Sequence, residues 1–262
     1  MRSGSDRLSD AFARAKREGR LALVAYLMSG DPDLETSARL ARVTLDEGAD
    51  VIELGVPFSD PLADGATVQR AAERALANGT RLGDVIALAR DLRRDRDVPI
   101  LLMGYANPFY RYGLERAARD MAAGGLAGII VPDLPYEEAG EWVPVLHDAG
   151  LVQISLVAPT TTDERLARIV PAAKGFLYCV SLTGVTGARE GLAPGVADFV
   201  ARVRRHTRLP VVVGFGISRP EHLRALRGVA DGAAVGSALV DAAARGEAEL
   251  GVLVRSLREA AA

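Results

Sequence analysis

The sequence predicts an eight-stranded α/β barrel, the (β/α)8 or TIM-barrel fold, with one extra helix before the first strand. Eight short apolar segments alternate with longer amphipathic segments along the 262 residues. A barrel of this class typically takes about 250 residues, and continuous apolar runs are typical of parallel strands that are covered on both faces. The expected strands are residues 21–27, 51–54, 100–103, 128–131, 152–157, 176–181, 211–215 and 233–235.

Amphipathic helices are expected between the strands. Apolar residues recur at helical spacing in 34–47, 136–149 and 196–207. Gly48, Gly124 and Gly150 each stand just before an expected strand. Glycine adopts the left-handed conformation that commonly ends a helix, so we expect these three residues to be C-terminal caps.

Polar residues mark where several helices begin. Asp31 with Pro32, and Thr162 with Arg165 after it, are expected to start helices. Ser9 is expected to open the N-terminal helix, which would cover the bottom of the barrel.

One domain over residues 1–262 is expected, because no linker, charge block or low-complexity stretch divides the chain. The main alternative is an open Rossmann-like sheet. That fold requires a glycine-rich turn after its first strand, and the segment 28–32 lacks this fingerprint.

The composition excludes several classes of function. A formal net charge of −2 offers no electrostatic reason to expect nucleic acid or an anionic membrane as partner. No apolar run approaches the roughly 18 residues of a membrane span, and residues 1–10 do not resemble a secretory signal. The one cysteine, Cys179, cannot form an internal disulfide, which suits a cytoplasmic location.

Glu53 is the most unusual residue of the expected barrel. It lies inside the second strand, where side-chain alternation places it on the same face as Val51 and opposite Ile52 and Leu54. A carboxyl group that faces the barrel interior is costly unless it is paired or used. Desolvation would favour its protonated form and make it a candidate general acid or base, and the alternative is a structural carboxylate bonded to backbone.

The loop after the second strand, residues 55–65, carries two further acidic residues towards the carboxyl ends of the strands, where barrel active sites lie. Asp64 is expected to be either the cap of the next helix or a catalytic base. Asp60, between Ser59 and Pro61, is expected to be a turn residue or an interface contact.

Glycines follow the last three strands. The segment 182–191 has three glycines, two threonines and an arginine and is expected to be either a lid over the substrate or a long surface loop. Tyr178, on the strand before it, is either a packing residue or a hydroxyl near the reaction. The segments 214–218 and 236–238 follow the seventh and eighth strands and predict a phosphate cradle of backbone N–H groups.

Other chemistries are disfavoured. The three histidines, His147, His206 and His222, fall in expected helices without metal-ligand spacing, so no metal site is predicted. Lys16 and Lys174, the only lysines, lie away from the carboxyl ends of the strands, which argues against a Schiff-base aldolase. A phosphate-binding barrel that uses carboxyl groups for acid–base catalysis remains.

Four segments of the chain resemble the motifs of one family, the tryptophan synthase α subunits. They are residues 53–65, 184–187, 214–218 and 236–237, in the family's order. The resemblance implies a lyase of tryptophan biosynthesis that cleaves indole-3-glycerol phosphate to indole and glyceraldehyde 3-phosphate by a retro-aldol reaction. It implies no cofactor in this chain.

The resemblance also implies roles for individual residues. Glu53 matches the proton-shuttling glutamate, Asp64 the aspartate that binds the indole N–H, and Tyr178 a tyrosine close to the glutamate. Thr186 matches the lid threonine that meets the aspartate. The matches to the phosphate donors and the indole pocket are Gly187, Gly216, Gly236 and Ser237, and Tyr26, Met103 and Ile130, respectively.

A partner follows from the same resemblance: a β subunit that contains pyridoxal phosphate, in an αββα tetramer in which indole passes between subunits. Pro57, Asp60, Asn107 and Pro132 lie in loops expected to meet it. The rivals are another phosphate-binding barrel, such as indole-3-glycerol phosphate synthase or a phosphosugar isomerase, a stand-alone lyase that releases indole, and a non-catalytic binding subunit. The synthase would require lysines at strand ends, and a mere binder would not require both Glu53 and Asp64.

Overall fold

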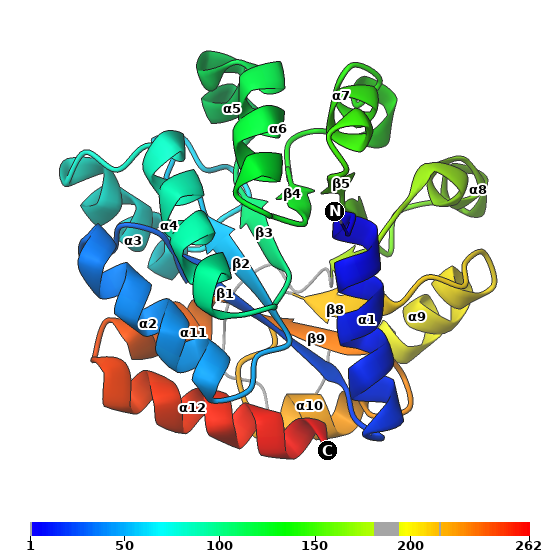
Figure 1. Cartoon of the computed structure of the whole chain (residues 1–262). Coiled ribbons are helices and arrows are strands. Elements are labelled where there is room, and N and C mark those ends of the chain that lie inside the picture. The colour runs from blue at the N-terminus through cyan, green and yellow to red at the C-terminus, as the bar shows by residue number, and fades with distance from the viewer. Residues whose placement is uncertain (1, 181–193, 215) are drawn as a thin grey trace.

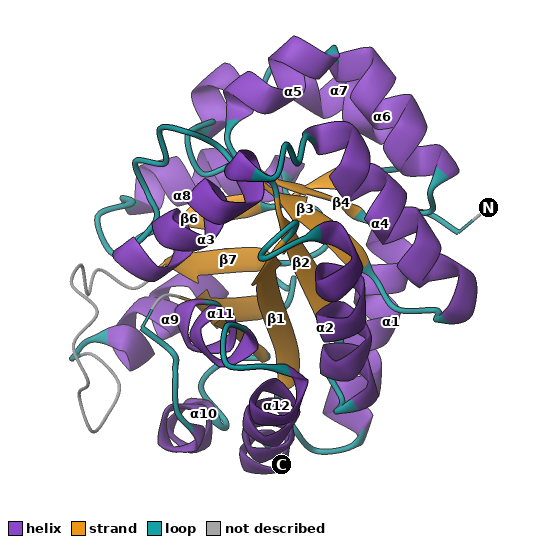
Figure 2. Cartoon of the chain, turned by 90° about the vertical axis from the view of Figure 1, so that its left-hand side faces the viewer, coloured by secondary structure: helices purple, strands orange, loops and turns teal. Residues whose placement is uncertain are grey.

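The strands of the computed structural model form one parallel, nearly closed barrel surrounded by helices (Figures 1 and 2). The structure describes residues 2–180, 194–214 and 216–262. Within these residues the strands are β1 Ala22–Met28, β2 Val51–Gly55, β3 Ile100–Met103, β4 Gly128–Ile130, β5 Val152–Gln153, β6 Ser155–Val157, β7 Leu177–Val180, β8 Val211–Gly214 and β9 Gly232–Val235. The barrel predicted from the sequence is therefore confirmed.

Helices follow most of the strands and cover the outside of the barrel (Figure 2). The described helices are α1 Gly4–Arg17, α2 Leu34–Asp46, α3 Ala66–Ala77, α4 Leu82–Asp95, α5 Ala106–Tyr112, α6 Leu114–Ala123, α7 Trp142–Asp148, α8 Asp163–Ile169, α9 Val196–Arg204, α10 Pro220–Leu226, α11 Ser237–Ala243 and α12 Glu247–Ala261, with short 3-10 helices at Tyr136–Glu138 and Val170–Ala172. None of the helices in the described ranges is long and apolar enough to cross a membrane.

The expected fifth strand is divided in two. The strand order is β5-β4-β3-β2-β1-β9-β8-β7-β6, so the two halves of residues 152–157 lie at opposite edges of the sheet. β5 pairs with β4, and β6 pairs with β7. Ile154, between the halves, donates its backbone N–H to the Ile129 carbonyl at 2.9 Å. The chain changes partners at Ile154, so this one segment brings the two edges together.

Side chains from alternate strand positions fill the barrel interior. Val51 lies in this interior cluster, whereas Ile52 and Leu54 pack outwards against the helices. This confirms the expected alternation and places Glu53 on the interior face with Val51. At the other end, Leu8 and Phe12 of α1 pack against Phe176 in the same cluster, so α1 closes the bottom of the barrel (Figure 1).

Two of the expected helix starts were wrong. Helix α1 begins at Gly4, five residues before Ser9, because Ser3 caps it and forms a reciprocal capping box with Asp6. Asp33, rather than Asp31, caps α2 through a hydrogen bond from the Thr36 N–H to its carboxylate. Asp31 instead forms an ion pair with Arg74. The cap at Thr162 is confirmed, since its hydroxyl accepts from the Arg165 N–H.

The helix ends agree better with the sequence. Gly48 and Gly150 have φ values of +102° and +74°, as expected for left-handed caps. After α6 the left-handed residue is Gly125, with φ of +73°, rather than Gly124. The expected helix over 136–149 is interrupted: a 3-10 turn covers Tyr136–Glu138, and α7 begins only at Trp142.

Candidate active site

A cavity of about 100 Å³ lies at the carboxyl ends of the strands, where a barrel of this class carries out its chemistry. It brings together residues from β1, β2, β3, β7 and β9 and from the loops and helices that follow them. Its lining consists of Tyr26, Glu53, Ala63, Asp64, Gly65, Val68, Met103, Tyr178, Gly216, Ile217, Ala234, Gly236 and Ser237. Eight residues selected from the sequence for catalysis, phosphate binding or the indole pocket thus meet at one cavity.

Glu53 is 1% exposed and stands beside Tyr26 in the register of β2 with β1. Its Oε1 atom is buried and has no hydrogen-bond partner within the described residues. Burial raises the pKa of the carboxyl group to about 8. No backbone group of a described residue donates a hydrogen bond to this oxygen, which argues against the alternative of a structural carboxylate. With this raised pKa, Glu53 is protonated near neutral pH.

Asp64 lines the same cavity, at the end of the loop after β2. Burial raises the pKa of its carboxyl group to about 6, and a hydrogen bond from Tyr105 opposes that rise. The N-cap of α3 is Gly65, without a side-chain cap. Of the two alternatives for Asp64, the helix cap is therefore wrong, and its carboxylate is available to the cavity.

Two buried tyrosines flank Glu53. Tyr26 and Tyr178 are 8% and 4% exposed, and burial, followed by nearby carboxyl groups, raises the pKa of both hydroxyls far above the ordinary value. Each ring end lies against a strand glycine: a Cβ atom added to Gly55 or Gly214 would stand 2.3 Å from the hydroxyl oxygen of Tyr26 or Tyr178, respectively. Glycine is thus required at both positions to admit the tyrosines.

The apolar part of the expected pocket is only partly reproduced. Met103 lines the cavity. Ile130 is fully buried in the hydrophobic cluster that fills the barrel interior, and it does not line the cavity. Val68, Ile217 and Ala234 are apolar lining residues that the sequence analysis did not select.

The expected phosphate donors lie on one side of the cavity. Gly216 follows β8 and has φ of +77°, and Gly236 is the N-cap of α11, which begins at Ser237. All three line the same cavity as the carboxyl groups. Gly187 and Thr186, and with them the expected lid, lie outside the described residues.

Sequence reasoning missed two further residues near the site. Tyr105 stands two residues after the end of β3, is 4% exposed and contacts the loop that carries Asp64. Leu62 is 94% exposed in that loop. The position of Tyr105 just after a strand was an available signal, whereas its contact joins positions 42 residues apart and has no local pattern.

The segments expected to meet a partner lie near the same end of the barrel, and Asn107, expected in a loop, lies in the first turn of α5. Asp60 and Asn107 are exposed, Pro132 is partly exposed, and Pro57 is buried. The Ala106 N–H donates to the Asp133 carboxylate at 3.0 Å, which ties the loop after β3 to the loop after β4.

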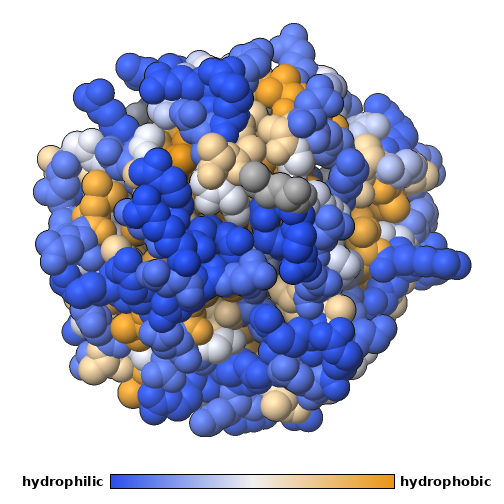
Figure 3. All heavy atoms as spheres, in the orientation of Figure 1, coloured by the Kyte–Doolittle hydropathy of each residue, from blue (hydrophilic) through white to orange (hydrophobic). Residues whose placement is uncertain are grey.

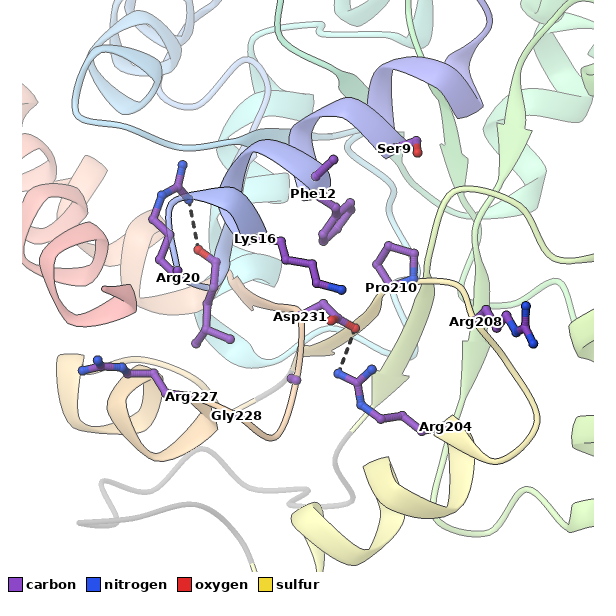
Figure 4. Close-up of a pocket in the computed structure, with 14 residues that line it drawn as sticks. Ser9, Phe12, Lys16, Arg20, Arg204, Arg208, Pro210, Arg227, Gly228 and Asp231 are labelled. Carbon is purple, nitrogen blue, oxygen red and sulfur yellow. Dashed lines mark hydrogen bonds and ion pairs between the residues drawn. The ribbon is translucent and has the colours of Figure 1, made fainter.

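A larger cavity, about 530 Å³, lies at the opposite end of the barrel beside α1 (Figure 4). Its cations include Lys16, Arg204 and Arg227, which stand at the C-terminal ends of α1, α9 and α10. Cations at these ends favourably oppose the helix dipoles, and Arg204 is paired with Asp231. The side chains of Arg208 and Arg227 point away from one another (Figure 4). The face of the molecule seen in the orientation of Figure 1 is mostly hydrophilic (Figure 3). Helix-end charge accounts for this cluster, so the smaller cavity is the candidate active site.

No group of three or more histidine, cysteine or carboxylate residues among the described positions has the arrangement of a metal site. His147 lies in α7 and His222 in α10, whereas His206 lies just beyond α9. Cys179 is buried on β7, where burial raises the pKa of its thiol to about 12 and leaves it unreactive.

A barrel whose strand ends hold two carboxyl groups of raised pKa in a partly apolar cavity is an enzyme of the acid–base class that acts on a small molecule. Residues 12–261 match the family described as tryptophan synthase alpha chain, and this chain belongs to that family, a family of lyase subunits.

Known relatives agree along nearly the whole chain. The tryptophan synthase alpha chain of Roseiflexus castenholzii is 58% identical over 236 residues, which are 90% of each chain. That of Synechococcus elongatus is 48% identical over 256 residues, 97% of this chain and 96% of the relative. A chain of tryptophan synthase from Mycobacterium tuberculosis superimposes with a TM-score of 0.92 at 39% identity, covering 100% of this chain and 99% of that one. The resemblance found in the motifs is therefore confirmed.

The raised pKa of Glu53 predicts that the free energy of unfolding depends on pH. The Glu53 carboxyl group ionises at its ordinary pKa of 4.5 in the unfolded chain and at about 8 in the folded protein. Between pH 4.5 and about pH 8 the folded state binds more protons than the unfolded state. The folded protein is therefore most stable below pH 4.5 with respect to this group, and it loses that stability as the pH rises to about 8. Relative to the wild type, Glu53→Gln should become more stable by a few kcal/mol across this range.

Urea unfolding of both proteins across that pH range measures the difference, in which the titration of Asp64 cancels because both proteins share it. The exposed residue Glu73 on α3 provides the control, Glu73→Gln, which shows the general effect of removing a carboxyl group. A constant difference for Glu53→Gln as well would contradict the raised pKa.

Proposed function

We propose that Glu53 and Asp64 together carry out the retro-aldol cleavage of indole-3-glycerol phosphate to indole and glyceraldehyde 3-phosphate. The observation that supports this most is their meeting at one cavity with different pKa values, about 8 and about 6. Between these values Glu53 is a neutral acid and Asp64 is a carboxylate. Environments that separate two carboxyl groups in this way assign them the acid and the base roles.

The two protonation states fit successive steps of the cleavage. The Asp64 carboxylate accepts a hydrogen bond from the indole N–H and stabilises the positive charge that develops when Glu53 protonates the ring carbon bearing the side chain. The Glu53 carboxylate then removes the proton of the adjacent glycerol hydroxyl. The carbon–carbon bond breaks, its electron pair returns to the ring, and the hydroxyl carbon becomes the aldehyde of glyceraldehyde 3-phosphate.

The apolar and glycine-rich sides of the cavity fit the two ends of this substrate. Tyr26, Met103 and Val68 offer apolar surface to the indole ring, and Gly216, Gly236 and Ser237 offer backbone N–H groups to the phosphate. Gly187 and the lid threonine Thr186 complete the proposed site from the loop after β7. Tyr178, packed near Glu53, would help orient the reacting carboxyl group.

Ser237→Asp should weaken phosphate binding without weakening the fold. An acidic residue in the first turn of α11 favourably opposes the helix dipole, but its charge repels the phosphate dianion, so the KM should rise about tenfold or more. Steady-state kinetics and competition by glycerol 3-phosphate measure the effect. Ser237→Asn is the matched neutral control and should bind far better than Ser237→Asp. Equal KM values for the two variants would place the phosphate elsewhere.

The family pairs with a β subunit, and pyridoxal phosphate belongs to that subunit rather than to this chain. We propose an αββα tetramer in which the loops carrying Asp60 and Pro132 and the start of α5 at Asn107 meet the β subunit, and indole passes directly into it. The exposure of Leu62 in the first of these loops supports this assignment, because a side chain that is 94% exposed gains by burial at an interface. Buried Pro57 would shape this loop from within.

An assay of the purified chain on indole-3-glycerol phosphate, with and without its β subunit, tests the proposal. Equimolar indole and glyceraldehyde 3-phosphate are expected, with faster turnover in the complex. Rapid indole release by the chain alone, unaffected by the β subunit, would favour a stand-alone lyase. Isomerisation without cleavage, or binding without turnover, would overturn the proposal in favour of the other rivals.

A further inference from the structure

Tyr105 touches the candidate site from outside the cavity. It is the N-cap residue of α5, two residues after β3 ends, and its side chain is buried although it is not among the lining residues. Its hydroxyl oxygen accepts a hydrogen bond from the Ala63 N–H at 2.9 Å. The same hydroxyl acts on the carboxyl group of Asp64, the next residue, and lowers the pKa of that group. One phenol thus contacts two consecutive residues of the loop that ends in Asp64.

The direction of these bonds follows from the chemistry of a phenol. A tyrosine hydroxyl has one hydrogen to donate and lone pairs to accept with. Because the Ala63 N–H occupies a lone pair, the single O–H is free to donate to the Asp64 carboxylate. That charge-assisted bond exists only while Asp64 is ionised, which is the state required to bind an indole N–H.

Tyr105 is itself held on two sides. Its ring lies 5.4 Å from the ring of Phe58, which belongs to the same loop as Asp64. The backbone N–H of Ala106, the next residue, donates to the Asp133 carboxylate at 3.0 Å. An anchored hydroxyl can fix the direction of a carboxylate on a loop better than a free side chain or water can.

We propose that Tyr105 is a positioning residue that aims the Asp64 carboxylate into the cavity. It acts through Asp64 and does not touch the reacting atoms. The inference rests on the proposed function for its catalytic consequence, whereas the contact between Tyr105 and Asp64 stands independently of the substrate.

Tyr105→Phe removes the hydroxyl and keeps the ring against Phe58. We expect kcat to fall about tenfold with a smaller change in KM, because the Asp64 interaction grows as charge develops on the indole. Loss of a hydrogen bond to the charged form should also move the acid limb of the pH–rate profile, which reports Asp64, upwards by about one pH unit. A purely structural role would change stability and leave this limb in place.

Tyr112→Phe is the matched control. The Tyr112 hydroxyl donates to the Asp120 carboxylate at 2.7 Å, a second tyrosine–aspartate bond that lies between α5 and α6, away from the cavity. Its removal should leave kcat and the acid limb unchanged.

The ¹³C chemical shift of the Asp64 carboxyl carbon, titrated in the wild type and in Tyr105→Phe, gives a readout that needs no turnover. An upward shift of the titration midpoint in the variant is expected. An unshifted midpoint overturns the inference, whatever happens to kcat. A shifted midpoint in a protein that fails to cleave indole-3-glycerol phosphate would uphold the contact and overturn the proposed function alone.

Discussion

Glu53→Gln is expected to lower kcat for indole-3-glycerol phosphate cleavage by about 10²–10⁴-fold, the contribution typical of a positioned general acid or base. The amide has nearly the shape of the carboxyl group, but it can neither give a proton to the indole ring nor take one from the glycerol hydroxyl. Because Glu53 is 1% exposed and Oε1 has no hydrogen-bond partner within the described part of the chain, no neighbouring group there can replace it through that oxygen.

The fold and phosphate binding should survive this change. Circular dichroism and the affinity for glycerol 3-phosphate check both, and Glu73→Gln on the exposed face of α3 checks for a general effect of removing a carboxylate. A Glu53→Gln variant that turns over at close to the wild-type rate would remove Glu53 from the mechanism.

Asp64→Asn should cause the second largest loss, about 10²-fold in kcat. The asparagine oxygen can still accept a hydrogen bond from the indole N–H, but it carries no charge to stabilise the protonated ring. The acid limb of the pH–rate profile, expected near the Asp64 pKa of about 6, should disappear in this variant. Substrate binding should change less than turnover, because the ring is neutral in the ground state.

Pre-steady-state measurement of indole release separates these effects from slow product loss. Asp91→Asn, on the exposed surface of α4, is the matched control and should behave as the wild type. An acid limb that persists unchanged in Asp64→Asn would assign that limb to another group and contradict the role given to Asp64.

Much of the site could be predicted because strand periodicity and barrel topology act together. Alternation placed Glu53 in the barrel interior, and the structure confirms that face with Val51 as its neighbour. The carboxyl ends of parallel strands converge, so residues that follow different strands, such as Asp64, Gly216 and Ser237, meet at one cavity without any sequence proximity.

What could not be predicted depends on contacts between distant segments or on competing local bonds. The division of the fifth strand at Ile154 depends on both edges of the sheet, which no local pattern encodes. Asp31 was expected to start the helix, but it pairs with Arg74 across 43 positions, and Asp33 caps α2 instead. The same holds for Tyr105, which reaches Ala63 and Asp64 only in the folded barrel.

A crystal structure of Glu53→Gln with indole-3-glycerol phosphate bound would test the central claim most directly, because the variant should hold the substrate without cleaving it. The account predicts the indole nitrogen within hydrogen-bonding distance of the Asp64 carboxylate, the reacting hydroxyl beside residue 53, and the phosphate at the backbone of Gly236 and Ser237. A substrate bound with its phosphate at residue 53, or outside this cavity altogether, would contradict it.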